Sequence, residues 1–290
     1  TAKGEFEGFF GKLRQAFSQI PAWSIIVEGM QLVQQAARET VTQIFEVNKA
    51  MTEIRKVASD GINADTLLRG TIKQSIDLGS DLNNMLDSLA EVARTYDDLN
   101  ESQLMAVNST ATIMANVSDL EVPEAMESLI GTMNAFKIEA EDSITVVDKL
   151  NEVDNQYAIS TKQLATGLQK ASATAEVFGV SIDELVGQIT GIGAVTMESG
   201  EIIGNSLKTI YSRLTTHDDA VSGLEDLGIA IRKVGEDGQE VNRTATEILS
   251  DLAGQWDNMS NVQQQNIGVT IAGRHQLSRL TDIKAMSLVA

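Results

Sequence analysis

Apolar residues along most of this chain recur at spacings of three and four, the period of an α-helix with one buried face. One such stripe runs through residues 5–20, and Pro21 ends it because proline cannot continue a helix interior. The stripe consists of Phe6, Phe9, Phe10, Leu13, Phe17 and Ile20. Packing on neighbouring helices is the simpler explanation. Contact with a membrane or a partner is the alternative, although the polar face lacks the strongly basic character of membrane-surface helices.

Two longer runs follow a heptad alternation of three and four residues. The first is Met30, Val33, Ala37, Thr40, Ile44, Val47, Met51, Ile54 and Ala58, and the second is Leu78, Leu82, Met85, Leu89, Val92, Tyr96 and Leu99. Gly61 and Asn63 form a break between them. A narrow apolar seam along a helix requires a partner helix. The partner is either another helix of an antiparallel hairpin in the same chain or the same helix in other copies of the chain.

From residue 100 the pattern changes to shorter helices with clear start signals. Four candidate capping boxes place a hydroxyl three residues before Glu or Gln. They are Ser160 with Gln163, Ser181 with Glu184, Thr244 with Glu247 and Ser260 with Gln263. The short segments between them predict a compact helical domain rather than a rod.

A weak internal repeat appears at an offset of sixty residues. The matching pairs are Gln103 and Gln163, Leu104 and Leu164, Ala111 and Ala171, Ala115 and Ala175, Val117 and Val177, Glu124 and Glu184, and Gly131 and Gly191. Ala-rich helices also produce such matches by chance. If the repeat is a duplication, it is a helix-turn-helix unit used twice and stacked on itself.

One β-hairpin signal interrupts the helical pattern near residues 229–242. Short runs that include Ile229, Ile231 and Val234 flank an Asp237-Gly238 pair, which is typical of a hairpin turn. The predicted fold is therefore all-α. Coiled-coil-like helices fill residues 1–99, and a compact helical domain with one small hairpin fills residues 100–290.

Composition narrows the functional classes. The 290 residues carry a net charge of −19, only 4% are aromatic, and cysteine is absent. An acidic chain does not favour a nucleic-acid interface, because DNA binding depends on Lys and Arg. The best candidate for a membrane span, Ile20 to Val33, is too short to cross a bilayer and contains Glu28. The chain begins at Thr1 and stops at Ala290 within an apolar stretch, which suggests an excerpt from a longer protein.

No catalytic pattern is convincing. The two histidines, His217 and His275, lack metal-site spacing, and His217 is expected at a helix junction. Lys208-Thr209 follows Leu207 rather than a glycine, so the nearby glycines do not form a phosphate-binding loop. Glu198-Ser199 is the one faint sign of a cell-wall hydrolase. We therefore predict a non-enzymatic protein with no cofactor and no metal.

Glycine spacing in residues 200–214 predicts a close helix contact. Gly200 and Gly204 share one helix face, and glycine lets two backbones approach closely. Leu207, Ile210 and Leu214 continue an apolar stripe, and Arg213 lies beside it within reach of an acidic partner. We therefore expect a helix-packing or interface role for Gly200, Gly204, Leu207, Arg213 and Leu214. Capping of a preceding turn is the alternative for the glycines.

The order of these segments resembles the core region of phage tail tape-measure proteins of the TP901 type. The resemblance rests on Phe178 to Leu185, Gly191 to Ala194 and Glu198 to Leu214, with its Gly200-x-x-x-Gly204-x-x-Leu207-Lys208 spacing. It continues through residues 227–257, which include Trp256, and through Ala272 to Leu277. It covers about residues 100–285. Residues 1–99 carry only heptads.

The resemblance implies a structural role. Such proteins occupy the tail lumen or tip, set tail-tube length during assembly in the host cytoplasm, and leave ahead of DNA at infection. It implies partners in the tail tube, the distal tail and the baseplate or tail tip. A three-fold homo-oligomer is favoured and six-fold symmetry is the alternative; no specific nucleic-acid binding is expected, and any membrane contact is confined to infection. The alternative function is a helical scaffold or adaptor of a bacterial contractile injection device.

Overall fold

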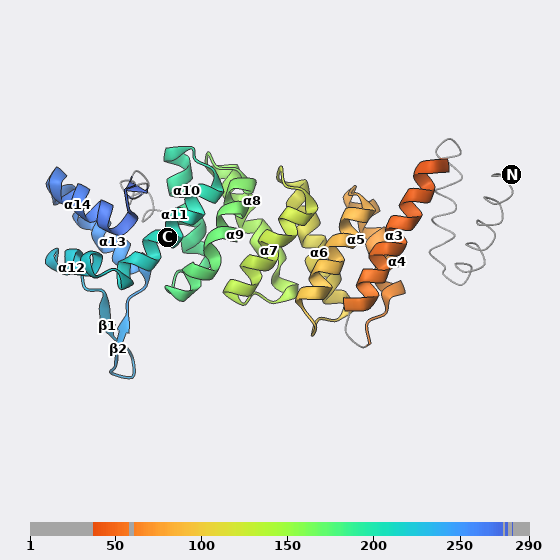
Figure 1. Cartoon of the computed structure of the whole chain (residues 1–290), viewed down its shortest axis with the longest axis horizontal. Helices are drawn as coiled ribbons and strands as arrows, with labels where there is room; N and C mark the ends of the chain where they lie inside the picture. The colour runs from red at the N-terminus through yellow and green to blue at the C-terminus, as the bar shows by residue number, and fades with distance from the viewer. Residues whose placement is uncertain (1–36, 58–60, 275, 278–279, 281–290) are drawn as a thin grey trace. The chain divides into compact units, whose positions relative to one another are not determined.

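The computed structural model describes residues 37–57, 61–274, 276–277 and 280 (Figure 1). The Phe-rich stripe at residues 5–20 and the heptad positions before residue 37 lie outside the described residues. The chain forms two compact units, Thr1–Asn108 and Ser109–Ala290. The domain boundary expected between residues 99 and 100 stays a prediction.

The first unit contains helices α3 (Ala37–Val57), α4 (Ala64–Leu78) and α5 (Leu82–Thr95), and the start of α6 (Glu101–Asn116). The break expected at Gly61 and Asn63 is present. Asn63 caps α4 by accepting hydrogen bonds from the amides of Asp65 and Thr66, at 3.0 and 3.1 Å. The cap satisfies amides that have no partner within the helix, and it therefore fixes where α4 begins.

Helices α3 and α5 pack on each other within this unit. Heptad positions Met51 and Ile54 of α3 are buried, as are Met85, Leu89 and Val92 of α5. The seams therefore find partners inside the chain. The arrangement differs from an antiparallel hairpin, which was one of the two alternatives. Helix α4 returns the chain between α3 and α5, so these two helices run parallel, and Asn83 at the start of α5 donates to Glu46 of α3 at 2.9 Å.

The second heptad run does not lie on one helix, which corrects the sequence-based expectation. Leu78 ends α4 and Leu82 begins α5. Between them, Gly79 adopts a left-handed conformation with φ 66°, and the Asp81 side chain caps α5. These local signals end one helix and start the next, although the apolar spacing continues across the break.

The second unit contains the rest of α6, ten further α- and 3₁₀-helices among its described residues, and one hairpin. They are α7 (Val122–Phe136), η1 (Ala140–Asp142), α8 (Ile144–Gln156), α9 (Thr161–Val177), α10 (Ile182–Thr196), α11 (Gly200–Thr216), α12 (Asp218–Asp226), β1 (Arg232–Val234), β2 (Glu240–Asn242), α13 (Ala245–Gln255), η2 (Trp256–Asn258) and α14 (Asn261–Ala272). The all-α prediction with one small hairpin is confirmed.

Three helices of this unit, α7, α9 and α11, form a row in which each packs on the next. Ser128 of α7 donates to the carbonyl of Ala165 of α9 at 2.7 Å, and Lys137 lies 3.6 Å from Glu176 further along both helices. These contacts ascend together in sequence, so α7 and α9 run parallel. Helices α8 and α10 connect the members of the row and also pack against α9.

The helix starts follow the capping signals. All four predicted capping boxes, at Ser160, Ser181, Thr244 and Ser260, are present with both reciprocal bonds. Two further reciprocal pairs, Glu121 with Glu124 and Asn100 with Gln103, were not predicted, because a carboxylate or an amide rather than a hydroxyl occupies the capping position.

The sixty-residue repeat corresponds to two segments with the same helix starts. Reciprocal bonds between Asn100 and Gln103 at the start of α6 mirror those of Ser160 and Gln163 at the start of α9. Caps at Glu121 and Ser181 then begin α7 and α10. The apolar pairs Leu104 and Leu164, Ala111 and Ala171, and Ala115 and Ala175 are buried in both segments.

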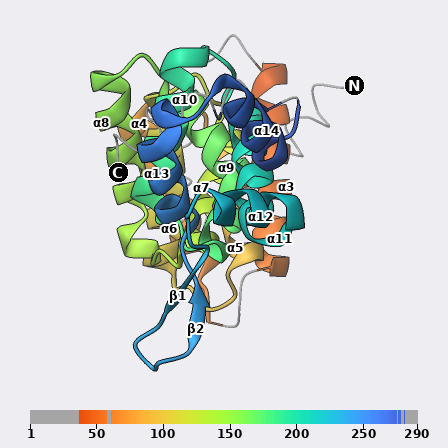
Figure 2. The same ribbon diagram turned by 90° about the vertical axis from the view of Figure 1, so that its left-hand side faces the viewer.

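The hairpin lies within the predicted range. Arg232 pairs with Asn242, Lys233 with Val241 and Val234 with Glu240. Gly238, which follows Asp237, has φ 79°, a conformation that glycine adopts without steric strain. The hairpin projects from the helices of the second unit (Figures 1 and 2).

A buried polar chain connects α10, α11 and α13. Tyr211 is fully buried, and its hydroxyl donates to the side-chain oxygen of Gln188. The Gln188 amide nitrogen donates to Thr246 at 3.0 Å. Burial, with a smaller contribution from Glu184, raises the pKa of Tyr211 well above its usual value of 10.

We expect Tyr211→Phe to lower the free energy of unfolding by about 1–3 kcal/mol, because the buried Gln188 oxygen loses its donor. The wild-type protein should also lose stability above pH ~10, where tyrosine ionises in the unfolded chain but stays neutral when folded. The variant should lack this alkaline component. Denaturant titrations at pH 8 and pH 11 measure both effects. Exposed Tyr157→Phe is the control, with a change within about 0.5 kcal/mol at pH 8.

Candidate functional site

Gly200 and Gly204 of α11 face α9 at a contact between backbones. A β-carbon at Gly200 would lie 1.9 Å from the carbonyl oxygen of Gln163, and one at Gly204 would lie 2.6 Å from the carbonyl oxygen of Gly167. Both distances are well below van der Waals contact. Only glycine therefore allows α9 and α11 to approach this closely.

The remaining candidates lie further along α11. Leu207 and Leu214 are fully buried, and Lys208 between them is exposed. Arg213 is half-buried, and its Nε donates to the carbonyl of Thr270 of α14 at 2.7 Å. Its observed partner is thus a backbone carbonyl. The role of these residues at an interface with other proteins stays a prediction.

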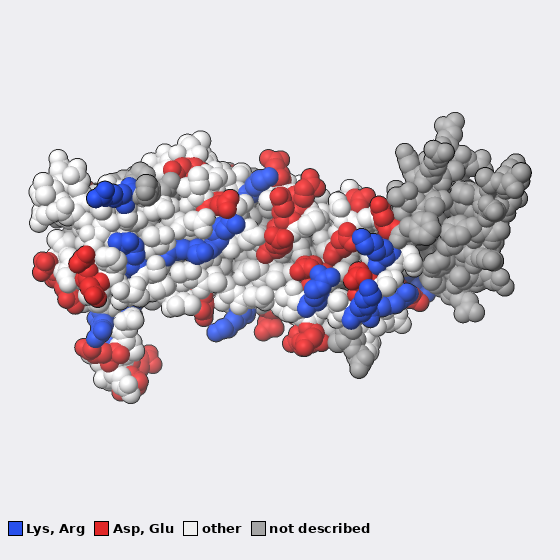
Figure 3. Space-filling view, viewed as in Figure 1, with Lys and Arg blue, Asp and Glu red and all other residues white. Residues whose placement is uncertain are grey.

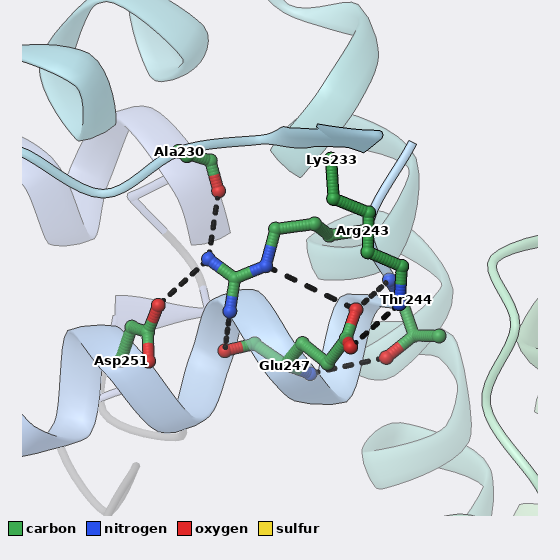
Figure 4. Close-up of polar contacts among 6 residues, drawn as sticks. All are labelled: Ala230, Lys233, Arg243, Thr244, Glu247 and Asp251. Atoms are coloured by element: carbon green, nitrogen blue, oxygen red, sulfur yellow. Dashed lines mark hydrogen bonds and ion pairs between the residues drawn. The ribbon is translucent and has the colours of Figure 1, made fainter. Parts of the chain in front are cut away.

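A group of polar contacts around Arg243 and Glu247, which we call the Arg243 clamp, joins the hairpin to α13 (Figure 4). Arg243, which follows β2, has a side chain that is only 17% exposed. Its Nη1 donates to the carbonyl of Ala230 at 2.9 Å and to Asp251 at 2.7 Å, and its Nη2 donates to the carbonyl of Glu247 at 3.4 Å. One guanidinium therefore joins the segment before β1, the end of β2 and the first turns of α13.

Glu247 completes this clamp. It accepts a hydrogen bond from Lys233 of β1 at 2.7 Å and one from the Thr244 amide at 2.8 Å. The Lys233 hydrogen bond, followed by the Thr244 amide and the charges of Lys233 and Arg243, holds the pKa of the Glu247 carboxyl below its usual range. The sequence predicts the Thr244 capping box, but it gives no sign of Arg243 and Lys233 as partners, because their spacing matches no motif.

Glu198, Ser199 and His217, which were considered for chemistry, lie at helix junctions, and His275 lies outside the described residues. Ser199 caps α11 by accepting from the Ile202 amide at 3.4 Å, and the Glu198 carbonyl accepts from Gln163 at 2.9 Å. His217 lies between α11 and α12, as predicted. The described residues contain no group of three or more His, Asp or Glu side chains suited to a metal ion. In that same part of the chain, no helix has the length and apolar character needed to cross a bilayer.

The described residues of the second unit thus form a row of packed helices with a glycine-dependent crossing and an anchored hairpin. Comparison with known sequences identifies the family. The chain belongs to the family of phage-related minor tail proteins, whose sequence model matches residues 72–273. It is therefore a component of a phage tail.

A curated relative is the tape measure protein of Pneumococcus phage Dp-1. The two sequences are 24% identical over 241 residues, which cover 80% of this chain and 20% of the relative. The chain thus spans about one fifth of the length of that protein. No solved structure matches the chain.

Proposed function

We propose that this chain is a non-enzymatic part of a tape-measure protein, which sets tail-tube length during assembly and leaves ahead of DNA at infection. The observation that carries the proposal is the similarity to a tape measure protein over 80% of the chain. We assign residues 100–285 to a core region of the TP901 type, on the segment order around Gly200 and Gly204. The tail lumen or tail tip is the proposed location.

The fold suggests which part of such a protein sets the tail length and which part contacts other tail proteins. A helix extends by about 1.5 Å per residue, so 290 residues in one helix would reach roughly 435 Å. Helices that fold back on one another, as α7 to α11 do, extend far less. We therefore assign the length-setting task to other parts of the parent protein, and contacts with the tail tube, the distal tail and the baseplate or tip to this part.

Three copies around the tail axis are the proposed assembly, with six as the alternative. The heptad seams no longer support this oligomer, because the described seam residues of α3 and α5 are buried within one chain. Support now comes from the symmetry of tails in the family that the chain resembles. Light scattering on the purified chain measures the copy number in solution, and the symmetry of assembled tails measures it in the particle. A single copy in both measurements would exclude a three-fold or six-fold assembly.

The length-setting proposal is tested by changing the parent gene outside residues 72–273. An in-frame deletion of sixty helical residues should shorten the tail by about 90 Å, since each helical residue contributes about 1.5 Å. Electron microscopy of purified tails measures the change. Tails of unchanged length would favour a helical scaffold or adaptor instead.

We expect no binding of duplex DNA at physiological salt. The net charge of −19 opposes contact with phosphates, and Figure 3 shows the Lys and Arg side chains of one face interspersed with Asp and Glu. A gel-shift titration with the purified chain at 150 mM salt measures this. Micromolar binding that weakens as salt is raised would contradict the prediction.

A further inference from the structure

Three exposed apolar side chains recur at forty-residue spacing in the second unit. Val117, Tyr157 and Met197 follow the ends of α6, α8 and α10, and they are 42%, 44% and 71% exposed. Each begins the short connection to the next helix of the row α7, α9 and α11. The same type of side chain therefore occupies the same position in three successive helix pairs.

The three connections lie at the same edge of the unit, around the start of α9. Lys162 donates to the carbonyl of Asp119, in the connection that holds Val117, at 2.9 Å. Gln163 donates to the carbonyl of Glu198, next to Met197, at 2.9 Å. Tyr157 lies in the connection that leads directly into α9.

Two further exposed apolar side chains, Val195 and Ile202, flank Met197 in the last turn of α10 and the first turn of α11. We call Val117, Tyr157, Val195, Met197 and Ile202 the apolar loop row. The other exposed large apolar residues in the described part of this unit are Val177, Val234, Val241 and Val262. More than half of this exposed set thus lies in or beside the three connections at one edge of the unit.

Met197 adds a conformational observation. It has φ 55° and ends α10 in the left-handed conformation, where glycine is the least strained residue. A residue with a β-carbon has a steric cost in this conformation, which Lys137 also adopts at the end of α7.

The charges around the apolar loop row are mainly negative. Asp119 and Glu121 lie in the first connection, Glu152 in α8 before Tyr157, and Glu198 beside Met197. Lys162, in the first turn of α9, donates to the carbonyl of Asp119 at this edge. A matching partner therefore carries Lys or Arg beside its apolar side chains.

We propose that the apolar loop row binds an extended segment of another tail component. That segment carries Lys or Arg residues beside its apolar side chains. Packed helices lie about 8–10 Å apart, and an extended chain in the polyproline II conformation rises about 3.1 Å per residue with about three residues per turn. Every third residue of such a segment therefore lies on one face and meets the next member of the row. A second copy of this chain is a poorer match, because its net charge is −19. The proposal rests on membership in the tail family and is independent of length-setting.

The experiment uses the full parent protein in assembled tails, with a photoreactive benzophenone amino acid at position 197. Illumination should cross-link it to a Lys- or Arg-containing peptide of a different tail protein, identified by mass spectrometry. The pair V117S/Y157S should reduce the yield about ten-fold, because apolar area buried against the partner is lost. The matched control pair is V177S/V262S, whose side chains are 72% and 66% exposed and lie outside the row. It should leave the yield unchanged.

Cross-links to a second copy of the chain, to an acidic segment, or to nothing would overturn the proposal. Equal yields in the two paired variants would also overturn it. Thermal melting of both pairs should match the unaltered chain, which excludes misfolding as the cause. Tail length is measured on the same particles: a normal length with lost cross-linking separates this contact from the length-setting function.

Discussion

Replacing Gly204 with leucine should lower the free energy of unfolding of the second unit by about 1–3 kcal/mol, the usual range for overpacking. The new β-carbon would meet the Gly167 carbonyl oxygen at 2.6 Å and the Lys170 β-carbon at 2.8 Å. Because the first of these atoms is backbone, rotamer changes cannot relieve the clash, and α9 and α11 must separate. Thermal melting should show a decrease of about 2–4 °C for each kcal/mol.

Gly131→Leu is the matched control for this substitution. Gly131 lies within α7, and a β-carbon there would meet nothing within 4 Å. Leucine favours helix more than glycine does, so the control should gain about 0.5–1 kcal/mol. Tail assembly is measured with both variants in the phage. An unchanged melting temperature and normal tails with Gly204→Leu would show that the crossing tolerates separation.

Local signals in the sequence predicted much of the fold. The four capping boxes at Ser160, Ser181, Thr244 and Ser260 fixed helix starts, because a side-chain acceptor three residues before its partner acts within one turn. The Asp237-Gly238 pair located the hairpin for the same reason. The spacing of Gly200 and Gly204 predicted a close approach but could not identify α9 as the neighbour.

Features that depend on distant contacts were not predictable in this way. The heptad spacing from Leu78 to Leu99 suggested one helix, but Gly79 and Asp81 divide it, so periodicity alone was misleading. The parallel arrangement of α3 and α5 follows from the return of the chain through α4. Arg243 and its acceptors at Ala230 and Asp251 are joined only after folding, and no sequence motif marks them.

The Arg243 clamp gives the second large expected effect. Arg243→Ala should reduce stability by about 1–3 kcal/mol, because the Ala230 and Glu247 carbonyls and the Asp251 carboxylate lose a charged donor. The loss should be local. A two-stranded hairpin is only marginally stable without packing or anchoring, so β1 and β2 should open while the row of α7, α9 and α11 persists.

Hydrogen exchange followed by mass spectrometry separates local opening from global unfolding. In the unaltered chain, the Arg243 amide donates to the Ile231 carbonyl at 2.9 Å at the base of the hairpin. Peptides covering residues 231–243 should therefore lose protection in Arg243→Ala, while peptides from α9 and α11 keep theirs. Arg243→Lys should restore protection only in part, because one ammonium group cannot replace the planar guanidinium fork that joins three acceptors.

Arg232→Ala is the matched control for the clamp. Arg232 belongs to the same hairpin, but its ion pair with Glu240 is 3.4 Å long, and the two side chains are 62% and 70% exposed. An exposed pair of this kind contributes about 0–1 kcal/mol, so hairpin protection should remain close to that of the unaltered chain. Equal protection in Arg232→Ala and Arg243→Ala would mean that strand pairing alone holds the hairpin and that the guanidinium does not anchor it.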